Sequence, residues 1–292
     1  MEKNYNKTGV NETTITEALP YIQAYSGKNI VIKYGGNAMN DPAIIETILQ
    51  DVATSKIVGM RPILVHGGGP EINAMLEKVG KEAKMINGLR VTDSETMEIV
   101  QMVLCGKVNK NLVAGLGRLG IKAIGLCGCD GGLIQAKKIS PKDGADLGYV
   151  GEVTQINAEI LTEFCGLNYV PVIASVGMGE GGESYNINAD VVAGEIAAAV
   201  DAEKLIYLTD IDGIRADVND KNSLISKINV AEIKRMIATG AINGGMIPKV
   251  TSCMNAIYKG VKNVTITNGM TPHAISKELF TTDGSGTLIT AD

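Results

Sequence analysis

Short apolar runs rich in β-branched residues recur along the chain, and the segments between them have helical spacing. The six runs are NIVIKY (29–34), PILVHG (62–67), KAIGLCG (122–128), YVPVIAS (169–175), KLIYLTD (204–210) and NVTITNG (263–269). Continuously apolar runs of this length are typical of strands buried on both faces. Strands that alternate with helices predict an α/β fold, a three-layer αβα sandwich with a mainly parallel central sheet. The glycine-rich segment 131–153 is instead predicted to form hairpins on the rim.

Composition limits the classes of function. With 292 residues, 45% of them hydrophobic, the chain can bury a large core as one extended domain or two lobes. The net charge is −5, without runs of Lys and Arg, and only 4% of residues are aromatic, so we expect no nucleic-acid partner. The N-terminus is polar, and no apolar stretch reaches about 20 residues, so neither a signal peptide nor a membrane span is expected.

The cysteines are odd in number and scattered, which favours a reducing compartment and a cytoplasmic location. They are Cys105, Cys127, Cys129, Cys165 and Cys253. The Cys127-Gly-Cys129 motif resembles half of a metal site. No second pair of cysteines follows it, and the only histidines in the sequence are His66 and His273. We therefore predict no metal site there.

The first 25 residues have the pattern of an amphipathic helix. Ile15, Leu19 and Ile22 fall at i, i+4 and i+7, and Pro20 is expected to kink the helix. Such a short helix is marginal in water, so its apolar face must dock. Its own subunit and a neighbouring subunit are both open as the docking surface.

Two glycine groups directly follow predicted strands. Gly35-Gly36 and Gly67-Gly68-Gly69 would lie at carboxyl ends of parallel strands, where ligands bind and where backbone N–H groups can approach phosphate. Tight turns that need positive φ would explain them as well. The GLGRLG stretch (115–120) precedes a strand, so it is interpreted as a helix end at Gly120 and not as a dinucleotide site. There is no GxxxxGK[ST] motif.

Three charged residues lie where a charge needs a partner. Lys33 interrupts an apolar strand and should point at an anion, unless it is an edge-strand lysine that reaches solvent. Lys249 lies near the start of a helix, where a cation is not favoured unless an anion is close. Asp190 opens a helical run and could simply be its N-cap.

The motif series of the whole chain resembles that of the amino-acid kinase family, in particular of the members that act on N-acetyl-L-glutamate. The motifs, in order, are VIKYGGNAM, VHGGGPEI, NGLRVT, YNINAD, LTDIDG, GGMIPKV and GSGTLI. The resemblance implies ATP-dependent phosphorylation of the γ-carboxylate of N-acetyl-L-glutamate to N-acetyl-L-glutamyl 5-phosphate, the second step of arginine biosynthesis. It also implies Mg²⁺ with ATP, held mainly by phosphates and water and by no assigned protein ligand.

Roles follow from the same resemblance. Lys33 and Lys249 would stabilise the transferred phosphoryl group, with Asp190 holding both lysines and Gly36 donating an amide. The substrate-binding residues would be Gly68, Gly69, Arg90 and Asn186. The ATP-binding residues would be Gly35, Gly36, Thr209, Asp210, Gly213, Gly245 and Met246. Two alternatives stay open: Arg90 as a surface arginine at a helix start, and Asp210 with Asp212 as an Asx turn.

Both ends of the chain resemble members that L-arginine inhibits. Those members have an N-terminal helix that links dimers into a hexamer, and the tail here reads HAISKELFTTDGSGTLI. The residues implied for an arginine site are Tyr21, Lys204, His273, Glu278, Gly284 and Gly286. We expect a homo-oligomer, a dimer or a trimer of dimers. The predicted division is a helical arm at 1–25 and a kinase domain at 26–292, with an acceptor-binding lobe at 26–200 and an ATP-binding lobe at 201–292.

Two alternative functions are open for a protein of this fold. Kinases of this fold that act on aspartate, glutamate, aminoadipate derivatives, carbamate or UMP are one alternative. A non-catalytic nucleotide or arginine sensor is another. The presence of both lysines and Asp190 disfavours a sensor, because a sensor needs no charge at a transfer point.

Overall fold

A central sheet of eight strands organises the molecule. The computed structural model describes residues 12–141, 144–217, 220 and 222–291. The strand order is β12-β14-β13-β11-β1-β2-β8-β5. These strands are β1 (Asn29–Tyr34), β2 (Arg61–His66), β5 (Ala123–Leu126), β8 (Val170–Ala174), β11 (Lys204–Thr209), β12 (Lys227–Asn229), β13 (Asn263–Asn268) and β14 (Gly286–Thr290). Every neighbouring pair is parallel except β13 with β14. All six strands predicted from the apolar runs are present.

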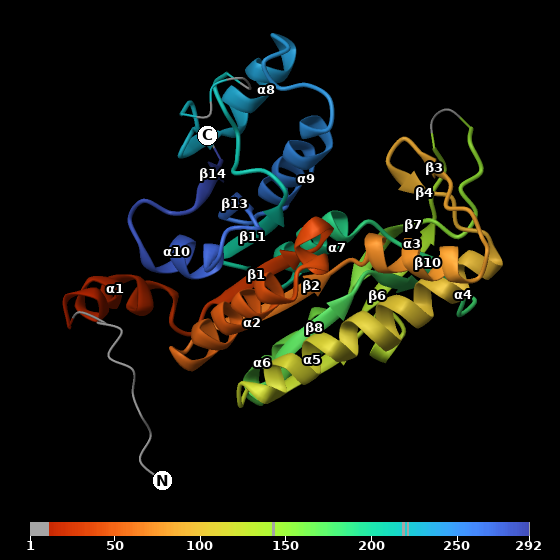
Figure 1. The fold of residues 1–292 in the computed structure, drawn as a ribbon, viewed down its shortest axis with the longest axis horizontal. Coiled ribbons are helices and arrows are strands. Elements are labelled where there is room, and N and C mark those ends of the chain that lie inside the picture. Colours follow the sequence, from red (N-terminus) through yellow and green to blue (C-terminus); the bar gives the residue numbers. More distant parts are fainter. Residues whose placement is uncertain (1–11, 142–143, 218–219, 221, 292) are drawn as a thin grey trace.

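Helices cover both faces of this sheet, as predicted (Figure 1). Along β1, Val31 packs into one core, whereas Ile30 and Ile32 pack into the other, because successive side chains of a strand point to opposite faces. The first core is closed by α6 (Ala158–Gly166), α7 (Ala189–Ala199), α8 (Val230–Ala238) and α9 (Met246–Tyr258). The second is closed by α2 (Pro42–Ile57), α3 (Gly69–Lys78), α4 (Ser94–Gln101), α5 (Asn109–Arg118) and α10 (Ala274–Phe280). The fold is thus a three-layer αβα sandwich.

The rim carries a smaller sheet and a short hairpin. The antiparallel pair β6 (Ile134–Lys138) and β7 (Gly151–Ile156) confirms the hairpin predicted for this segment. With β9 (Val176–Met178) and β10 (Ser184–Asn186), they form a sheet in the order β10-β9-β6-β7. The hairpin β3 (Met85–Ile86) and β4 (Leu89–Arg90) lies on the same side of the molecule, far from α1 (Figure 1).

Three short helical segments depart from α-helical geometry. The 3₁₀ segment η1 (Gly36–Asn40) follows β1, and η3 (Asp130–Gly132) follows β5. Between α4 and α5, the segment η2 (Met102–Val108) is π-helical. Helix α5 ends at Arg118, and Gly120 has φ 76°, so the glycine stretch at 115–120 does terminate a helix before a strand.

The N-terminal helix α1 (Glu12–Tyr25) contains Pro20 and lies beside α10 at the edge of the molecule (Figure 1). The Tyr21 hydroxyl hydrogen bonds with Oγ1 of Thr282 at 2.8 Å, and Tyr25 packs against the second core. Leu19 is 48% exposed. The helix therefore docks on its own chain while leaving apolar surface free. Residues 1–11 of the predicted arm lie outside the described residues.

No helix in the described part of the chain combines the length and the apolar character that crossing a bilayer requires.

Candidate active site

One pocket brings many of the predicted residues together. It has a volume of about 410 Å³ and opens at the carboxyl ends of β1, β2 and β8. We name it the glycine-loop pocket. Its polar lining comprises Lys33, Gly35, Gly36, Gly67, Gly68, Gly69, Arg90, Ser175, Asn186, Asn188 and Asp190. Its apolar lining includes Ile72, Met85, Leu89, Leu104, Val150 and Ile187. Every predicted substrate-binding residue, with Lys33 and Asp190, lines this one pocket.

The two glycine loops lie side by side at the bottom of the pocket. The Gly67 amide donates to the Tyr34 carbonyl at 3.1 Å, and a Cβ on Gly35 would lie 3.1 Å from Lys33 Nζ. A Cβ on Gly68 would lie 2.5 Å from Leu104 Cδ2, so a larger residue there would have to displace the Leu104 side chain. Gly36 has φ 72° and needs glycine for its conformation. The loops thus serve as tight turns and also bring backbone close to the pocket.

Lys33 is paired with Asp190 within the pocket. Nζ of Lys33 lies 2.8 Å from Oδ1 of Asp190, and the side chains are 13% and 24% exposed. Because β1 lies between β11 and β2, the alternative of an edge-strand lysine is wrong. The N-cap alternative for Asp190 is wrong too, since Asn188 caps α7 by accepting from the Asp190 amide at 2.8 Å. The Asp190 carboxylate is therefore available to the lysine.

Lys249 has a different partner. It lies in the first turns of α9 and forms an ion pair with Asp210, which follows β11. Of the two lysines, Asp190 therefore pairs with Lys33, whereas the resemblance implied that it holds both. The hydrogen bond from Lys249, with a smaller contribution from the charge of Lys33, lowers the pKa of Asp210. The carboxylate of Asp210 is consequently in the electrostatic range of both lysines.

Arg90 presents an unsatisfied donor to the pocket. The residue is 9% exposed, and its Nη2 donates to the Gly69 carbonyl at 3.4 Å. Nη1 is buried, and no described residue accepts a hydrogen bond from it. Burial lowers the pKa of the guanidinium. A surface arginine is therefore excluded, and an anion in the pocket would complete the hydrogen bonding of this side chain.

Asn186 and Ser175 face the pocket from the β8–β10 region. The Asn186 side-chain amide donates to Oγ1 of Thr92 at 3.2 Å, which fixes its orientation. Ser175 is 2% exposed and directly follows β8. Sequence reasoning missed Ser175, although its place at a strand's carboxyl end is the same signal that identified the glycine loops.

His66 holds the second glycine loop in place. Its Nδ1 lies 2.8 Å from the Gly67 carbonyl, and its Nε2 lies 3.1 Å from Nδ2 of Asn109. Asn109 Nδ2 is a donor, so Nε2 accepts and Nδ1 carries the proton that is donated to Gly67. Complete burial lowers the pKa of His66 to about 4, so the ring is neutral near pH 7. The sequence analysis assigned no role to this residue.

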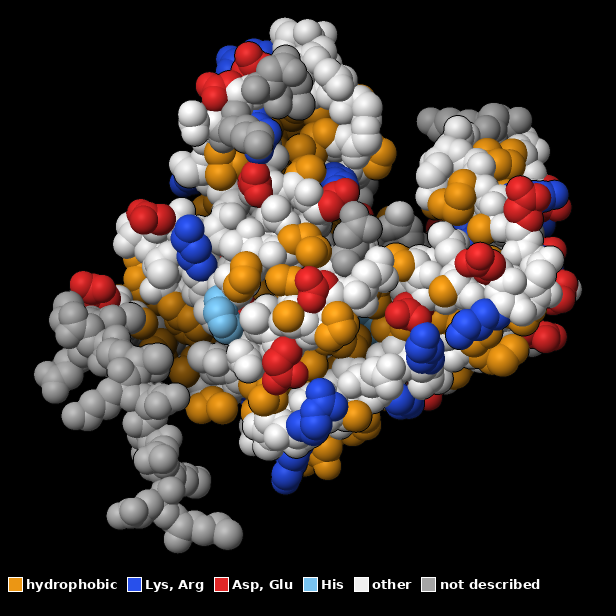
Figure 2. Space-filling view, in the orientation of Figure 1, with side chains coloured by type: hydrophobic (Ala, Val, Ile, Leu, Met, Phe, Trp, Pro, Cys, Tyr) orange, Lys and Arg blue, Asp and Glu red, His pale blue; other side chains and the backbone are white. Residues whose placement is uncertain are grey.

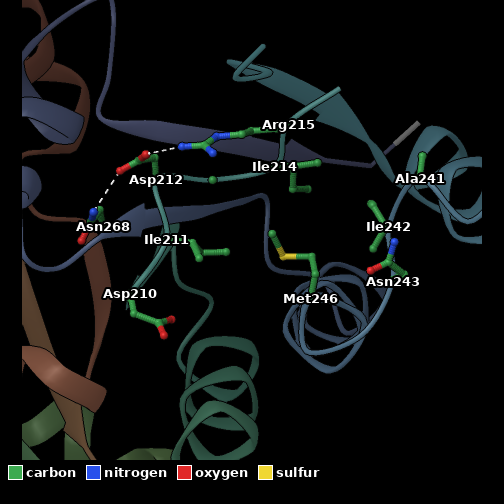
Figure 3. Close-up of a pocket in the computed structure, with 11 residues that line it drawn as sticks. Asp210, Ile211, Asp212, Ile214, Arg215, Ala241, Ile242, Asn243, Met246 and Asn268 are labelled. Atoms are coloured by element: carbon green, nitrogen blue, oxygen red, sulfur yellow. Dashed lines mark hydrogen bonds and ion pairs between the residues drawn. The ribbon is translucent and has the colours of Figure 1, made fainter. Parts of the chain in front are cut away.

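A second pocket, of about 320 Å³, lies at the carboxyl ends of β11 and β13 (Figure 3). We name it the Asp212 pocket. The lining residues are Asp210, Ile211, Asp212, Gly213, Ile214, Arg215, Ala241, Ile242, Asn243, Met246 and Asn268. Asp212 accepts from Arg215 Nη2 and from Asn268 Nδ2, each at 2.9 Å. Figure 3 shows Met246, Ile211 and Ile214 around the same space. The pocket therefore combines apolar walls with a fixed carboxylate.

Of the predicted ATP-binding residues beyond the glycine loops, Asp210, Gly213 and Met246 line the Asp212 pocket. Thr209 supports it from behind, since its hydroxyl donates to the Ile211 carbonyl at 3.1 Å, and Gly245 is the residue at the start of α9. The sequence analysis missed the remaining lining residues. Asn268 could have been found, because it ends β13.

The two pockets lie at the carboxyl ends of neighbouring strands. Lys33 and Asp190 border the glycine-loop pocket, Asp210 borders the Asp212 pocket, and β1 and β11 are adjacent strands. Figure 2 shows a hollow in the surface between the part that carries α8 and the part that carries the β3–β4 hairpin. Lys33 also contributes to the lowered pKa of Asp210, so the two ion pairs lie within electrostatic range of each other.

A separate cluster near α10 gathers most residues of the predicted arginine site. Nζ of Lys204 lies 2.6 Å from Oε1 of Glu278, and the side chains are 5% and 6% exposed. Glu278 also accepts from Thr265 Oγ1 and from the Ser285 amide, both at 2.9 Å. We name these residues the Glu278 cluster. Lys204 Nζ lies 6.0 Å from the centre of the Tyr25 ring, so the cluster reaches α1.

The other residues of this prediction lie around the cluster, except His273. A Cβ on Gly284 would lie 2.8 Å from Oε2 of Glu278, and one on Gly286 would clash with the Ile266 carbonyl. Tyr21 contacts the same loop through Thr282. His273 precedes α10, where its Nδ1 lies 2.8 Å from Oδ1 of the buried Asp51 on α2. The structure thus gives His273 a partner on another helix.

Comparison with known proteins gives the family of this chain. The model of the amino acid kinase family matches residues 28–268. The chain belongs to the amino acid kinase family. Within the family it is similar to curated proteins named acetylglutamate kinase: that of Moorella thermoacetica is 51% identical and that of Heliobacterium modesticaldum 49% identical. The alignments cover 97% and 99% of this chain and the same shares of those proteins. This family member is a kinase, a phosphotransferase with a carboxyl group as acceptor.

Solved structures of other proteins share the fold. The N-acetylglutamate synthase of Neisseria gonorrhoeae, complexed with coenzyme A and N-acetyl-glutamate, has a TM-score of 0.86 at 24% identity. The match covers 96% of this chain and 63% of the synthase chain. The carbamate kinase of Giardia lamblia bound to AMP-PNP has a TM-score of 0.66 at 16% identity, covering 92% of this chain. These likenesses concern the fold.

Proposed function

We propose that this kinase transfers the γ-phosphoryl group of ATP to the γ-carboxylate of N-acetyl-L-glutamate, a step of arginine biosynthesis. The observation that carries the proposal is a pair of lysines, Lys33 and Lys249, each held by a carboxylate that lines one of two pockets at neighbouring strands. The relatives named acetylglutamate kinase, about 50% identical over nearly the whole chain, support the choice of acceptor.

The glycine-loop pocket is proposed to bind the acceptor. The unsatisfied Nη1 of Arg90 would receive the α-carboxylate, and a guanidinium can bind it with two hydrogen bonds. Asn186 would bind the acetylated amide, and the apolar walls at Leu104 and Val150 suit a methyl group. The γ-carboxylate would then point towards Lys33.

Charge and position would do the chemical work. The transferred phosphoryl group carries negative charge between an attacking carboxylate and ADP, so catalysis depends on positioning and on preorganised cations. Lys33 and Lys249 would neutralise this charge, and the amides of Gly36, Gly68 and Gly69 would donate to phosphate oxygens. The acceptor carboxylate is already ionised near pH 7, so the step needs no general base.

Among the described residues, the carboxylates nearest to the two proposed catalytic lysines are Asp190 and Asp210, and each is already paired with one of these lysines. We therefore assign no protein ligand to Mg²⁺ and propose that phosphate oxygens and water hold it. When bound with ATP, the ion neutralises phosphate charge.

The Asp212 pocket is proposed to hold the adenine and ribose of ATP. Its apolar side chains suit a purine ring, and the Asp212 carboxylate suits ribose hydroxyls. This assignment supports the division into an acceptor-binding lobe at 26–200 and an ATP-binding lobe at 201–292, which we retain as a proposal together with the arm at 1–25.

We also propose inhibition by L-arginine at the Glu278 cluster and assembly of dimers into a hexamer through α1. The supporting observations are the buried carboxylate of Glu278, the contact of Tyr21 with Thr282, and the exposed Leu19. A bound guanidinium would compete with Lys204 for Glu278. Because Lys204 lies near Tyr25 of α1, this competition would change how α1 packs on the rest of the chain.

A substrate panel tests the central proposal. Purified protein with Mg-ATP should release ADP with N-acetyl-L-glutamate and much less with glutamate, aspartate or carbamate. Equal rates on glutamate would contradict the acceptor assignment. L-Arginine in the same assay tests inhibition, and light scattering of a chain that lacks residues 1–25 tests the arm, which should then yield dimers.

A further inference from the structure

Two cysteines in the loop after β5 lie close together. Sγ of Cys127 lies 3.3 Å from Sγ of Cys129. Cys105, in the π-helical segment η2, is near enough to Cys127 for the two thiols to shift each other's pKa. The sequence showed only the Cys127-Gly-Cys129 pair, which alone is too small for a metal site.

A carboxylate completes the group. One oxygen of Asp130 and the sulfurs of Cys127 and Cys129 all lie within 4.8 Å of one another. Oδ2 of Asp130 accepts from the Cys127 amide at 2.7 Å, so the carboxylate is fixed towards the sulfurs. Hydrogen bonds of this kind orient ligands in metal sites.

The backbone that presents the two thiols is tightly held. A Cβ on Gly128 would lie 2.5 Å from the Val176 carbonyl, and the Gly128 amide donates to that same carbonyl at 2.7 Å. The loop is therefore pressed against β9, with little freedom to move. A preformed group of donors loses less entropy on binding than a flexible one.

We propose that Cys127, Cys129 and Asp130 form a binding site for one thiophilic cation, with Zn²⁺ as the natural candidate. Two sulfurs and one carboxylate oxygen supply three ligands of a tetrahedral zinc site, and water would take the fourth position. Sulfur donors disfavour Mg²⁺ and Ca²⁺, which take oxygen ligands. Cys129 is exposed, so the ion can enter from solvent.

The position gives the site a structural role. Gly128 in this loop rests on Val176, and the preceding residue, Ser175, lines the glycine-loop pocket. A bound ion would stiffen the loop after β5 beside the wall of that pocket. The inference concerns metal binding alone and does not depend on which acceptor the kinase uses.

Co²⁺ is the probe for the test, because thiolate ligands give it intense near-ultraviolet charge-transfer absorption and tetrahedral geometry gives it strong visible bands. Protein that has been reduced and treated with chelator should bind one Co²⁺ per chain, with both signals, and Zn²⁺ should displace it. Cys129→Ser and Cys127→Ser should each weaken binding at least about tenfold, in line with the loss of a ligand. Asp130→Asn keeps an acceptor for the Cys127 amide and should weaken binding while leaving the sulfur signal.

The matched control is Cys165→Ala, which removes a free thiol elsewhere in the fold and should bind Co²⁺ as the unaltered chain does. Zn²⁺ should raise the thermal unfolding midpoint of the unaltered chain and of Cys165→Ala, but not of Cys129→Ser. The proposal is overturned if the unaltered chain shows only weakly absorbing six-coordinate Co²⁺, or if Cys129→Ser binds as tightly as the unaltered chain. A Cys127–Cys129 disulfide formed by mild oxidation, without Co²⁺ binding by the reduced protein, would equally overturn it in favour of a redox pair.

Discussion

Nζ of Lys33 and Oδ1 of Asp190 lie 2.8 Å apart in the lining of the glycine-loop pocket. Strand β1 and the first turn of α7 place them there, and each side chain is mostly buried. The charge of the carboxylate holds the ammonium group in place, since Oδ1 forms an ion pair with Lys33 and accepts no hydrogen bond from the described residues. Preorganisation of this kind is what a charge-stabilising lysine requires.

Asp190→Asn keeps the size of the side chain but removes the charge that orients Lys33. We expect kcat to fall about 10²- to 10³-fold, as it does when a preorganised electrostatic group is lost. Steady-state kinetics measure the effect, with Asp201→Asn, an exposed carboxylate just beyond α7, as the control. Unchanged kcat for Asp190→Asn would show that Lys33 needs no such partner.

Lys249→Ala and Asp210→Ala should be coupled, because the two side chains form one ion pair. Lys249→Ala is expected to lower kcat about 10³-fold, and Asp210→Ala about tenfold, since the lysine remains. The double variant should be no worse than Lys249→Ala alone. A cycle of kcat values measures this, and strictly multiplicative losses would mean that Asp210 acts apart from Lys249.

Arg90→Met should separate binding from stability. The substitution keeps much of the apolar stem but removes a buried donor without a described partner, so the ligand-free protein should unfold at the same temperature or higher. KM for the acceptor should rise about 10- to 100-fold or more with a smaller change in kcat. A large drop in the unfolding midpoint with normal KM would instead make Arg90 a structural residue.

Glu278→Gln leaves the buried Lys204 ammonium without its anion. We expect a loss of about 3 kcal/mol in the free energy of unfolding, the size typical of a broken buried ion pair. Urea unfolding measures it. The control is Glu203→Gln at the more exposed pair with Lys262, where the loss should stay below about 1 kcal/mol. Equal losses at the two sites would contradict the buried character of the first pair.

His66 should make stability depend on pH in a defined window. Its pKa is about 4 in the folded protein, below the ordinary 6.5, because burial disfavours the charged ring. The unfolded chain therefore binds more protons between these values, so stability is complete above about pH 6.5 and falls as the pH drops towards 4. The loss is at most about 3 kcal/mol.

Urea midpoints at pH 7, 6 and 5 test this dependence. His66→Gln should be less stable at pH 7 but should show a flatter decline than the unaltered chain. Parallel declines in the two proteins would assign the pH dependence to other groups.

The sheet could be predicted from the sequence because its evidence is local. Each of the six apolar runs became a strand, and Gly120 ended a helix as its position indicated. The π-helical form of η2 could not be predicted, because the spacing of its apolar residues suits an α-helix equally well. The antiparallel placement of β14 depends on pairing with β13, which no local pattern encodes.

Partners were harder to predict than positions. Asn188 and Asp190 are both good capping residues, and only the structure shows that Asn188 caps while Asp190 contacts Lys33. The pairing of Lys249 with Asp210 depends on how α9 lies against β11. Cys105 reaches Cys127 from another element for the same reason. Contacts between distant segments are set by tertiary packing, which residue spacing does not report.

Strand β14 lies between β12 and β13, so residues 286–290 connect β12 to the rest of the sheet. During synthesis β5, β8, β2, β1, β11 and β13 can pair with one another before β14 emerges. Strand β12, whose described partner in this sheet is β14, has to wait until residue 290 has left the ribosome. A nascent chain stalled before that point would hold a nearly finished acceptor side beside an unpaired β13 edge, the form of the protein most exposed to aggregation and to chaperones.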